Sequence, residues 1–197
     1  GEPALVQDGS EGPYRVTLAT DYEQSALDTL KSNFPSISTV CGDIRRVASE
    51  ELLELSDLAP GDAGLVVGGP PCTPFSKSGF WLKEKRESRD PNASLLDEYV
   101  RIVRDLKPEG FVLENVQALT YKTHKKQFER LLAGLTDCGY SVGWKVLIAA
   151  DYGVPQLRRR VFVVGRRDGG PISMPPPTHS GWSDRDDDCR RRRKSNL

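Results

Sequence analysis

The residues best suited to chemistry lie in the loop GGPPCTPFS, which spans residues 68–76 and follows a short apolar run at 64–67. An apolar run bounded by glycines is typical of a buried parallel strand, and α/β proteins place their sites in the loops that follow such strands. Three prolines restrict the backbone around Cys72, so its thiol is held on a stiff support. A cysteine in this setting is either a buried apolar residue or a nucleophile, and the loop alone leaves both interpretations open.

Two further segments carry charged side chains beside apolar runs. Glu114 and Asn115 follow the run at 111–113, and a carboxyl group at the end of a buried strand is suited to exchange protons near neutral pH. Arg158 and Arg160 precede another apolar run, and in a strand these two side chains face the same way. The alternative for Glu114 is an ordinary acid at the end of a strand, and the alternative for Arg158 and Arg160 is a solvated basic strand edge.

In order and spacing, these segments resemble the cytosine-C5 methyltransferase family. Residues 68–79 (GGPPCTPFSKSG) resemble its nucleophile motif, residues 111–119 (FVLENVQAL) its Glu-Asn-Val motif, and residues 151–167 (DYGVPQLRRRVFVVGRR) its Gln-x-Arg-x-Arg motif. Weaker similarity to cofactor-binding segments surrounds Asp21 and Asp43. The resemblance implies an α/β fold with the Rossmann-like sheet of S-adenosylmethionine-dependent methyltransferases, acting on cytosine in double-stranded DNA.

The resemblance also implies a role for each residue of the catalytic set. Cys72 is expected to attack C6 of the cytosine, which makes C5 able to accept a methyl group. Glu114 is expected to contact N3 and the exocyclic amine, and Arg160 the O2 of the base. Arg158 is expected beside them, where fixed positive charge favours a thiolate. Asn115 and Gln156 are expected to support the loop.

The expected cofactor is S-adenosylmethionine, and the resemblance assigns acidic, aromatic and apolar residues to it. A carboxylate after a first strand can accept hydrogen bonds from ribose hydroxyls, and an adjacent aromatic ring can stack on adenine. The residues expected to contact the cofactor are Asp21, Tyr22, Asp43, Ile44, Pro70 and Leu95. The polar segment 76–89 resembles a loop that closes over a flipped base, with Ser76, Ser78 and Arg89 as phosphate contacts.

The chain departs from the family pattern in two places. Thr73 stands where the family usually has Gln, and its hydroxyl can still bond to the loop. The family's Gly-rich first motif, which lets backbone approach the cofactor, finds no counterpart, and no GxGxxG occurs. We therefore expect the first strand and the target-recognition domain to be missing, and a complementing chain to carry them.

Several functions remain open at this stage. The chain is either a DNA cytosine-5 methyltransferase, whole or in part, or a truncated non-catalytic remnant or one part of a split enzyme. A methyltransferase acting on cytosine in RNA, such as tRNA, is a second alternative. A bacterial restriction–modification system in the cytoplasm is the expected setting.

Hydrophobic periodicity predicts strands alternating with helices, which is typical of a parallel α/β sheet. We expect a flexible segment at 1–14, a partial catalytic domain at 15–167, and an extended segment with a charged tail at 168–197. The expected strands are 15–20, 38–41, 64–67, 111–113, 140–149 and 160–164, and the expected helices are 23–33, 48–55, 94–106 and 125–138.

Composition limits the remaining classes. The 197 residues include 28 Lys and Arg against 28 Asp and Glu, so a uniformly basic nucleic-acid coat is absent. Hydrophobic residues make up 37%, with no apolar run long enough to span a membrane. The four cysteines show no CxxC pair, which argues against a metal site and against a disulfide framework.

Overall fold

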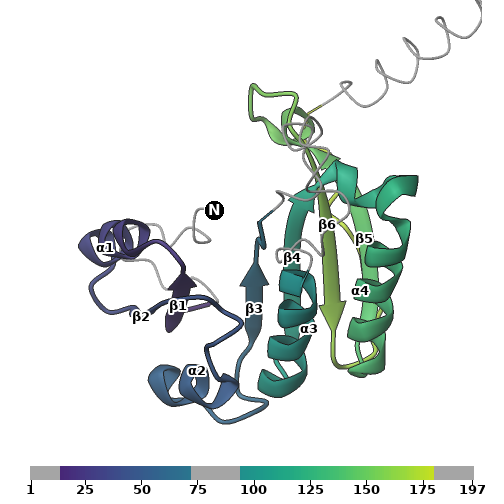
Figure 1. The fold of residues 1–197 in the computed structure, drawn as a ribbon. Coiled ribbons are helices and arrows are strands. Elements are labelled where there is room, and N and C mark those ends of the chain that lie inside the picture. The colour runs from purple at the N-terminus through teal and green to yellow at the C-terminus, as the bar shows by residue number, and fades with distance from the viewer. Residues whose placement is uncertain (1–13, 72–93, 180–197) are drawn as a thin grey trace, which may run out of the picture.

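The computed structural model describes residues 14–71 and 94–179, which form two sheets with their helices (Figure 1). The predicted N-terminal segment at 1–13, most of the predicted catalytic loop at 72–93 and the charged tail at 180–197 lie outside the described residues. No described helix is long and apolar enough to cross a membrane.

The smaller sheet contains two parallel strands, β1 (Leu18–Asp21) and β2 (Ser38–Cys41). The helix α1 (Gln24–Asn33) connects them, and α2 (Ser49–Ser56) follows β2. A small apolar cluster of Val40, Val47 and Leu52 holds this unit together, with Ile102 from a helix of the larger unit packed against it. The two units therefore share an apolar contact.

The larger sheet has the strand order β3-β4-β6-β5. Its strands are β3 (Leu65–Gly68), β4 (Gly110–Val116), β5 (Ser141–Ile148) and β6 (Arg159–Arg166). The helices α3 (Ser94–Leu106) and α4 (Lys125–Asp137) cover one face, where alternate residues of β4 and β6 are fully buried (Figure 1). The main core lies between this face and the helices and includes Val103, Phe111, Leu113, Leu131, Leu135, Val161 and Val163.

The expectation of an all-parallel sheet is wrong for the last two strands. β3 and β4 are parallel, but β6 runs antiparallel to both β4 and β5. β5 and β6 are joined by the short link 149–158, which contains the 3-10 helix η6 (Ala149–Tyr152) and no crossover helix. A link of this kind returns the chain beside the strand it left, so it produces an antiparallel pair.

The predicted elements are otherwise found close to their expected places. The strand at 38–41 and the helix at 94–106 have the predicted bounds. β4 extends past the apolar run to Val116, since pairing with β6 carries Glu114 and Asn115 into the strand. The short 3-10 helices η4 (Gln117–Thr120) and η5 (Lys122–His124) were not predicted.

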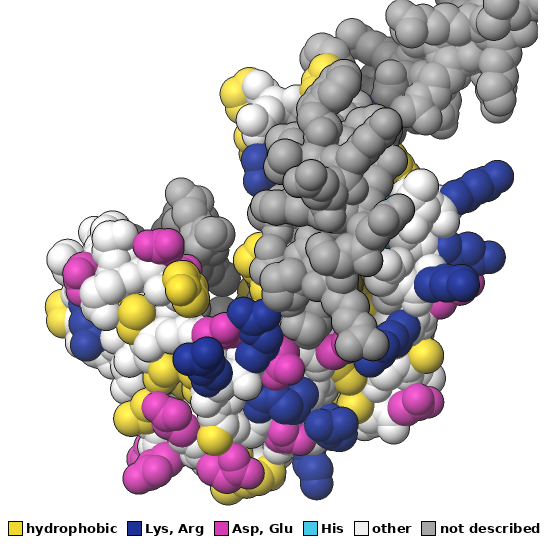
Figure 2. Space-filling model, in the orientation of Figure 1, with side chains coloured by type: hydrophobic (Ala, Val, Ile, Leu, Met, Phe, Trp, Pro, Cys, Tyr) yellow, Lys and Arg dark blue, Asp and Glu magenta, His cyan; other side chains and the backbone are white. Residues whose placement is uncertain are grey.

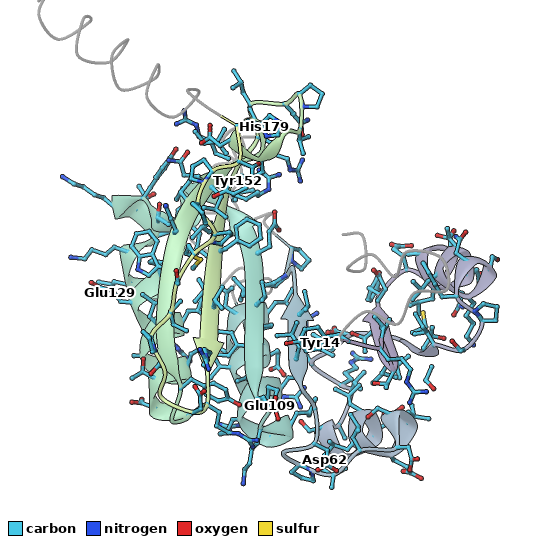
Figure 3. The ribbon with its side chains drawn as sticks, turned by 180° about the vertical axis from the view of Figure 1, so that it is seen from behind. Tyr14, Asp62, Glu109, Glu129, Tyr152 and His179 are labelled. Atoms are coloured by element: carbon cyan, nitrogen blue, oxygen red, sulfur yellow. The ribbon has the colours of Figure 1, made fainter. Side chains whose placement is uncertain are left out.

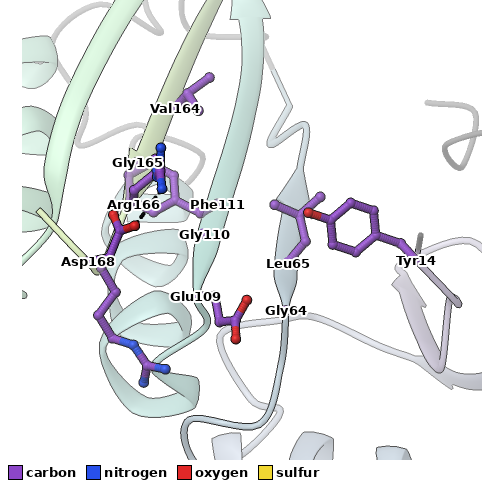
Figure 4. A pocket seen from close by; sticks show the side chains of 11 residues that line it. Tyr14, Gly64, Leu65, Glu109, Gly110, Phe111, Val164, Gly165, Arg166 and Asp168 are labelled. Carbon is purple, nitrogen blue, oxygen red and sulfur yellow. Dashed lines mark hydrogen bonds and ion pairs between the residues drawn. The ribbon is translucent and has the colours of Figure 1, made fainter. Parts of the chain in front are cut away.

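β1 and β3 each leave one edge without a strand partner among the described residues. β1 pairs with β2 and β3 pairs with β4, and Figure 1 shows a space between β1 and β3. A cavity of about 630 Å³ opens beside β3, lined by Tyr14 ahead of β1 and by Leu65 of β3 (Figure 4). Leu65 and Val67 are 36% and 60% exposed. Within the described residues this edge of β3 is unpaired, and the strand exposes apolar side chains on one face.

Candidate active site

Glu114 and Arg160 form an ion pair on adjacent strands. Arg160 Nε lies 2.7 Å from Glu114 Oε1. In the antiparallel register Glu114 is opposite Phe162 and Val116 is opposite Arg160, so the two charged residues are diagonal neighbours. Both side chains stand on the sheet face that α3 and α4 leave uncovered, because the alternate positions Leu113 and Val161 are buried in the helix-covered core.

Asn115 points to the opposite face and ties β4 to the loop that leaves β3. Its Nδ2 donates a hydrogen bond of 3.1 Å to the carbonyl of Pro70. Its Oδ1 accepts one of 2.8 Å from the backbone N–H of Val116. Asn115 is 2% exposed, so neither bond competes with solvent. The backbone of Pro70 is therefore fixed beside β4.

At Gly69 this loop passes beside the ion pair, at a distance that would leave room for a Cβ. A Cβ placed at Gly69 would lie 3.7 Å from Glu114 Oε2. At the preceding position, a Cβ on Gly68 would lie 2.5 Å from Cε2 of Tyr99, so a side chain there would collide with the ring. Tyr99 also donates a hydrogen bond to the carbonyl of Val66 at 3.3 Å. The end of β3 is thus held from two sides.

Sequence reasoning did not single out Tyr99, although it lies on the apolar stripe of the helix expected at 94–106. Its ring packs edge-to-face against Phe111, with the centroids 6.2 Å apart. Burial raises the pKa of the Tyr99 hydroxyl above its ordinary value, so the group remains a donor. Gly68, directly before the loop, was the available sequence signal that a large side chain packs against the end of β3.

The other expected catalytic and loop residues are not brought to this pair by a described contact. The side chains of Arg158 and Gln156 are exposed, and the carbonyl of Arg158 accepts the N–H of Ala149 at 2.9 Å. Arg158 precedes β6 rather than lying within it, so strand alternation does not fix its direction. Cys72, Ser76, Ser78 and Arg89 lie outside the described residues.

The residues expected to hold a nucleoside come together where β1 and β2 end. Asp21 closes β1 opposite Cys41, and Asp43 follows two residues beyond Cys41. Asp21 Oδ1 accepts the N–H of Glu23 at 2.8 Å, and the Asp21 carbonyl accepts the N–H of Gly42 at 2.9 Å. The ring of Tyr22 is 72% exposed. Two carboxylates and an exposed aromatic ring thus occupy one sheet edge.

Asp43 is ionised under all ordinary conditions. Arg45 Nε lies 2.8 Å from Asp43 Oδ1, and Arg45 Nη2 lies 2.5 Å from Asp43 Oδ2. These bonds, together with the backbone N–H of Arg45, lower the pKa of Asp43 from 3.8 to about 2. Since each carboxylate oxygen has more than one acceptor direction, Asp43 can still accept a ligand N–H.

The remaining two cofactor candidates lie on the larger unit. Leu95 is half-buried in the first turn of α3, and Pro70 is half-buried in the loop after β3. Ile44 packs against the small apolar cluster around Val47, which fixes its place beside Asp43.

The segment after β6 packs onto the sheet and η6. A Cβ on Gly143 would lie 2.6 Å from Cγ2 of Ile172, so this segment crosses β5 closely. The carbonyl of Asp151 accepts the N–H groups of Thr178 and His179 at 3.0 and 2.9 Å. Figure 3 shows His179 beside Tyr152 at one end of the sheet. Residues 168–179 therefore belong to the same folded unit as β5.

Basic and acidic side chains are interspersed over α2 and α3 on the face shown in Figure 2. Within the described residues, no group of three or more His, Cys, Asp or Glu is arranged to hold a metal ion. The side chains available to a ligand at the ends of β1 and β2 are the carboxylates of Asp21 and Asp43, the guanidinium of Arg45 and the ring of Tyr22.

Comparison with known proteins matches nearly the whole chain to one family. The family model described as C-5 cytosine-specific DNA methylase matches residues 4–191. The Type II methyltransferase M.SacI of Streptomyces achromogenes is 69% identical over 185 residues, which are 94% of this chain and 47% of that protein. M.AquIA of Picosynechococcus, also a Type II methyltransferase, is 34% identical over 174 residues, covering 84% of this chain and 68% of that protein.

The fold is shared with a solved structure of an Escherichia coli prophage protein described as a DNA modification methyltransferase. The TM-score is 0.70 at 24% identity, and the match covers 85% of this chain and 46% of that one. The chain spans about half the length of M.SacI and of this structural neighbour.

Proposed function

Because the chain belongs to the C-5 cytosine-specific DNA methylase family, we propose that it supplies the catalytic residues of an enzyme that methylates C5 of cytosine in DNA, with S-adenosylmethionine as the methyl donor. Cys72 is the nucleophile, and Glu114 and Arg160 bind the base. The Type II names of the bacterial relatives M.SacI and M.AquIA support a restriction–modification setting in the bacterial cytoplasm.

The observation that carries this proposal is the Glu114–Arg160 pair beside the backbone of Gly69 and Pro70. A carboxyl group and a guanidinium share one sheet face at 2.7 Å. Cys72 follows Pro70 by two residues, and two residues of chain span at most about 7 Å. Asn115 fixes the carbonyl of Pro70, and the short chain distance from Pro70 supports a place for the proposed nucleophile near the two groups that would hold its substrate.

In the proposed reaction the Cys72 thiolate adds to C6 of the cytosine and forms a C–S bond. Glu114 hydrogen-bonds N3 and the exocyclic amine, and Arg160 hydrogen-bonds O2, so the charge moved into the ring is stabilised. The electron pair at C5 would then accept the methyl group of a bound sulfonium donor, whose S–CH3 bond would break to give a neutral thioether. A solvent base then takes the C5 proton, the electron pair of the C5–H bond re-forms the C5–C6 double bond, and the C–S bond breaks to release the Cys72 thiolate.

The edge formed by β1 and β2 fits the nucleoside part of the donor. Asp21 keeps acceptor capacity beyond its bond to Glu23, which suits ribose hydroxyls. The exposed ring of Tyr22 suits stacking on adenine, and Asp43 suits its amino group. When bound, S-adenosylmethionine supplies the electrophilic methyl group.

We further propose that a strand from outside the described residues lies between β1 and β3 and carries a Gly-rich turn for the methionine end of the donor. The edges that β1 and β3 leave unpaired among the described residues support this, as do the exposed side chains of Leu65 and Val67. The 47% coverage of M.SacI also supports it. A strand in this place would pair with both sheets and close the cavity beside Tyr14.

The test is a chimera in which this chain replaces the matching 185 residues of M.SacI. With S-adenosylmethionine and duplex DNA containing 5-fluorocytosine, whose C5 cannot lose a proton, the chimera should form a denaturation-resistant adduct. Cys72→Ser should abolish the adduct, and Cys138→Ser should not. An adduct on Cys41 or Cys138 would refute the assignment, and an adduct with RNA but not DNA would identify RNA as the substrate.

The isolated 197-residue chain provides the second comparison. It should bind S-adenosylmethionine more weakly than the chimera and transfer no methyl group to DNA, because the Gly-rich turn is absent. Titration calorimetry and a tritiated-methyl assay measure both. Tight binding and transfer by the isolated chain would overturn the proposed complementing strand.

A further inference from the structure

Arg101 of α3 makes four side-chain hydrogen bonds, and three of them reach residues outside α3. Its Nη2 donates to the carbonyls of Ile44 at 2.9 Å and Val47 at 3.1 Å. Its Nη1 donates to Ser49 Oγ at 2.7 Å, and its Nε donates to Glu98 Oε2 at 2.7 Å. One planar guanidinium thus uses four donor directions at once.

The partners of Arg101 are themselves fixed. Ser49, 4% exposed at the start of α2, donates a hydrogen bond of 2.8 Å to Asp105 Oδ2. Glu98, Arg101 and Asp105 are spaced three and four residues apart, so they form one stripe along α3. Ile102 beside this stripe packs into the apolar cluster of the smaller sheet. The Arg101 side chain is 23% exposed, which limits competition by water.

Arg101 binds the turn between β2 and α2, which also carries Asp43 and Ile44. The two carbonyls that it binds, at residues 44 and 47, lie in the turn between β2 and α2. Within that turn the N–H of Arg46 bonds to the Asp43 carbonyl at 2.8 Å. The opposite face of α3, with Leu96 and Val103, packs on the larger sheet. Arg101 therefore links this turn to the unit that carries Glu114.

We infer that Arg101 is a positioning residue for the adenosine end of the donor. From α3 of the larger unit it holds the turn at 42–48 of the smaller unit in the conformation that binds adenosine. This inference rests on the proposed function for the identity of the ligand. Among the described residues no strand joins β1 to β3, so the contacts of α3, which include the bonds of Arg101 and the packing of Ile102, link the two units. Lysine cannot replace arginine here, since an ammonium group lacks the planar fork that reaches two carbonyls and a hydroxyl together.

The test uses the full chain and the variant Arg101→Lys, which keeps the charge, with Arg104→Lys as the matched control. Arg104 lies on the same helix, is 62% exposed and pairs with Asp105 at 3.3 Å. The first readout is amide hydrogen exchange without ligand. Arg101→Lys should speed exchange across residues 43–52 by about tenfold, because several charge-assisted hydrogen bonds are lost, with β4 unchanged.

The second readout is the dissociation constant of S-adenosylmethionine, which should rise about fivefold or more in Arg101→Lys and stay constant in Arg104→Lys. Unchanged exchange at 43–52, or faster exchange throughout the chain, would overturn the positioning role. Faster local exchange with an unchanged dissociation constant would reduce Arg101 to a structural contact. If the unaltered chain and the chimera both fail to bind the donor, the proposed function fails, while the exchange comparison still decides whether Arg101 holds the turn.

Discussion

Asn115 and Glu114 are sequence neighbours that do two separate tasks because a strand sends successive side chains to opposite faces. Glu114 stands on the open face and pairs with Arg160 at 2.7 Å. Asn115 enters the helix-covered core and binds the carbonyl of Pro70 at 3.1 Å. β4 therefore positions both the carboxyl group of Glu114 and the loop at Pro70, and a displacement of β4 would disturb both.

We predict that Glu114→Gln lowers methyl transfer by the M.SacI chimera at least about 100-fold, the usual effect of losing a proton-transferring side chain. The amide keeps the size of the side chain but cannot exchange a proton or pair with Arg160. Steady-state methyl transfer measures the effect. The control is Glu109→Gln, an exposed acid just before the same strand. Equal activity in Glu114→Gln and Glu109→Gln would remove Glu114 from the mechanism.

Asn115→Ala should destabilise the chain by about 1–3 kcal/mol, because the N–H of Val116 and the carbonyl of Pro70 lose buried partners. Urea denaturation measures this difference in unfolding free energy. Asn33→Ala is the control, since Asn33 is exposed and bonds only to its own helix at Thr29. A loss in Asn115→Ala no larger than in the control would show that the tether to Pro70 is not formed.

The ion pair of Asp43 and Arg45 predicts a specific dependence on pH. The pKa of Asp43 in the folded chain is about 2, below its ordinary 3.8. A lowered pKa means that the pair stabilises the fold fully above about pH 4, and that this contribution disappears as the pH falls towards 2. Carbon-13 NMR of the carboxyl group measures the titration. Arg45→Gln should move the midpoint back towards 3.8, and an unchanged midpoint would contradict the pair.

The sequence was sufficient to predict several of the elements that position the candidate site. Glycines and prolines around Cys72 indicated a stiff loop after a strand, and the structure has β3 ending at Gly68 with Asn115 bound to Pro70. The apolar period of residues 94–106 predicted α3 with its bounds. These features are local, so spacing and backbone restriction reveal them.

Features that depend on contacts across the chain were not predictable in the same way. The antiparallel direction of β6 depends on the link at 149–158. The apolar residues of a strand do not indicate whether it runs parallel or antiparallel to its neighbours. Arg101 appeared as one charge on an amphipathic helix, while its partners outside that helix lie more than 50 residues earlier. Arg158 was paired with Arg160 by strand alternation, but β6 begins at Arg159.

Gly165 provides a last prediction about the core beneath the site. It lies opposite Phe111 in the register of β4 and β6, and a Cβ there would overlap the ring atoms Cε1 and Cζ of Phe111. The ring is fully buried and packs edge-to-face with both Tyr99 and Tyr140, at 6.2 and 5.2 Å between centroids, so moving it would disturb both contacts. Gly165→Ala should therefore cost about 1–3 kcal/mol, as overpacking of a filled core does.

Gly64→Ala is the matched control for this substitution. Its Cβ would meet the ring of Tyr14 at an ordinary 3.5 Å beside the cavity. An alanine at a compatible position restricts the unfolded chain, so the control should be neutral or more stable by up to about 1 kcal/mol. Urea denaturation of both variants decides the outcome. Equal stability of Gly165→Ala and the unaltered chain would mean that Phe111 is not held between the two tyrosines, and that the strand carrying Glu114 has room to shift.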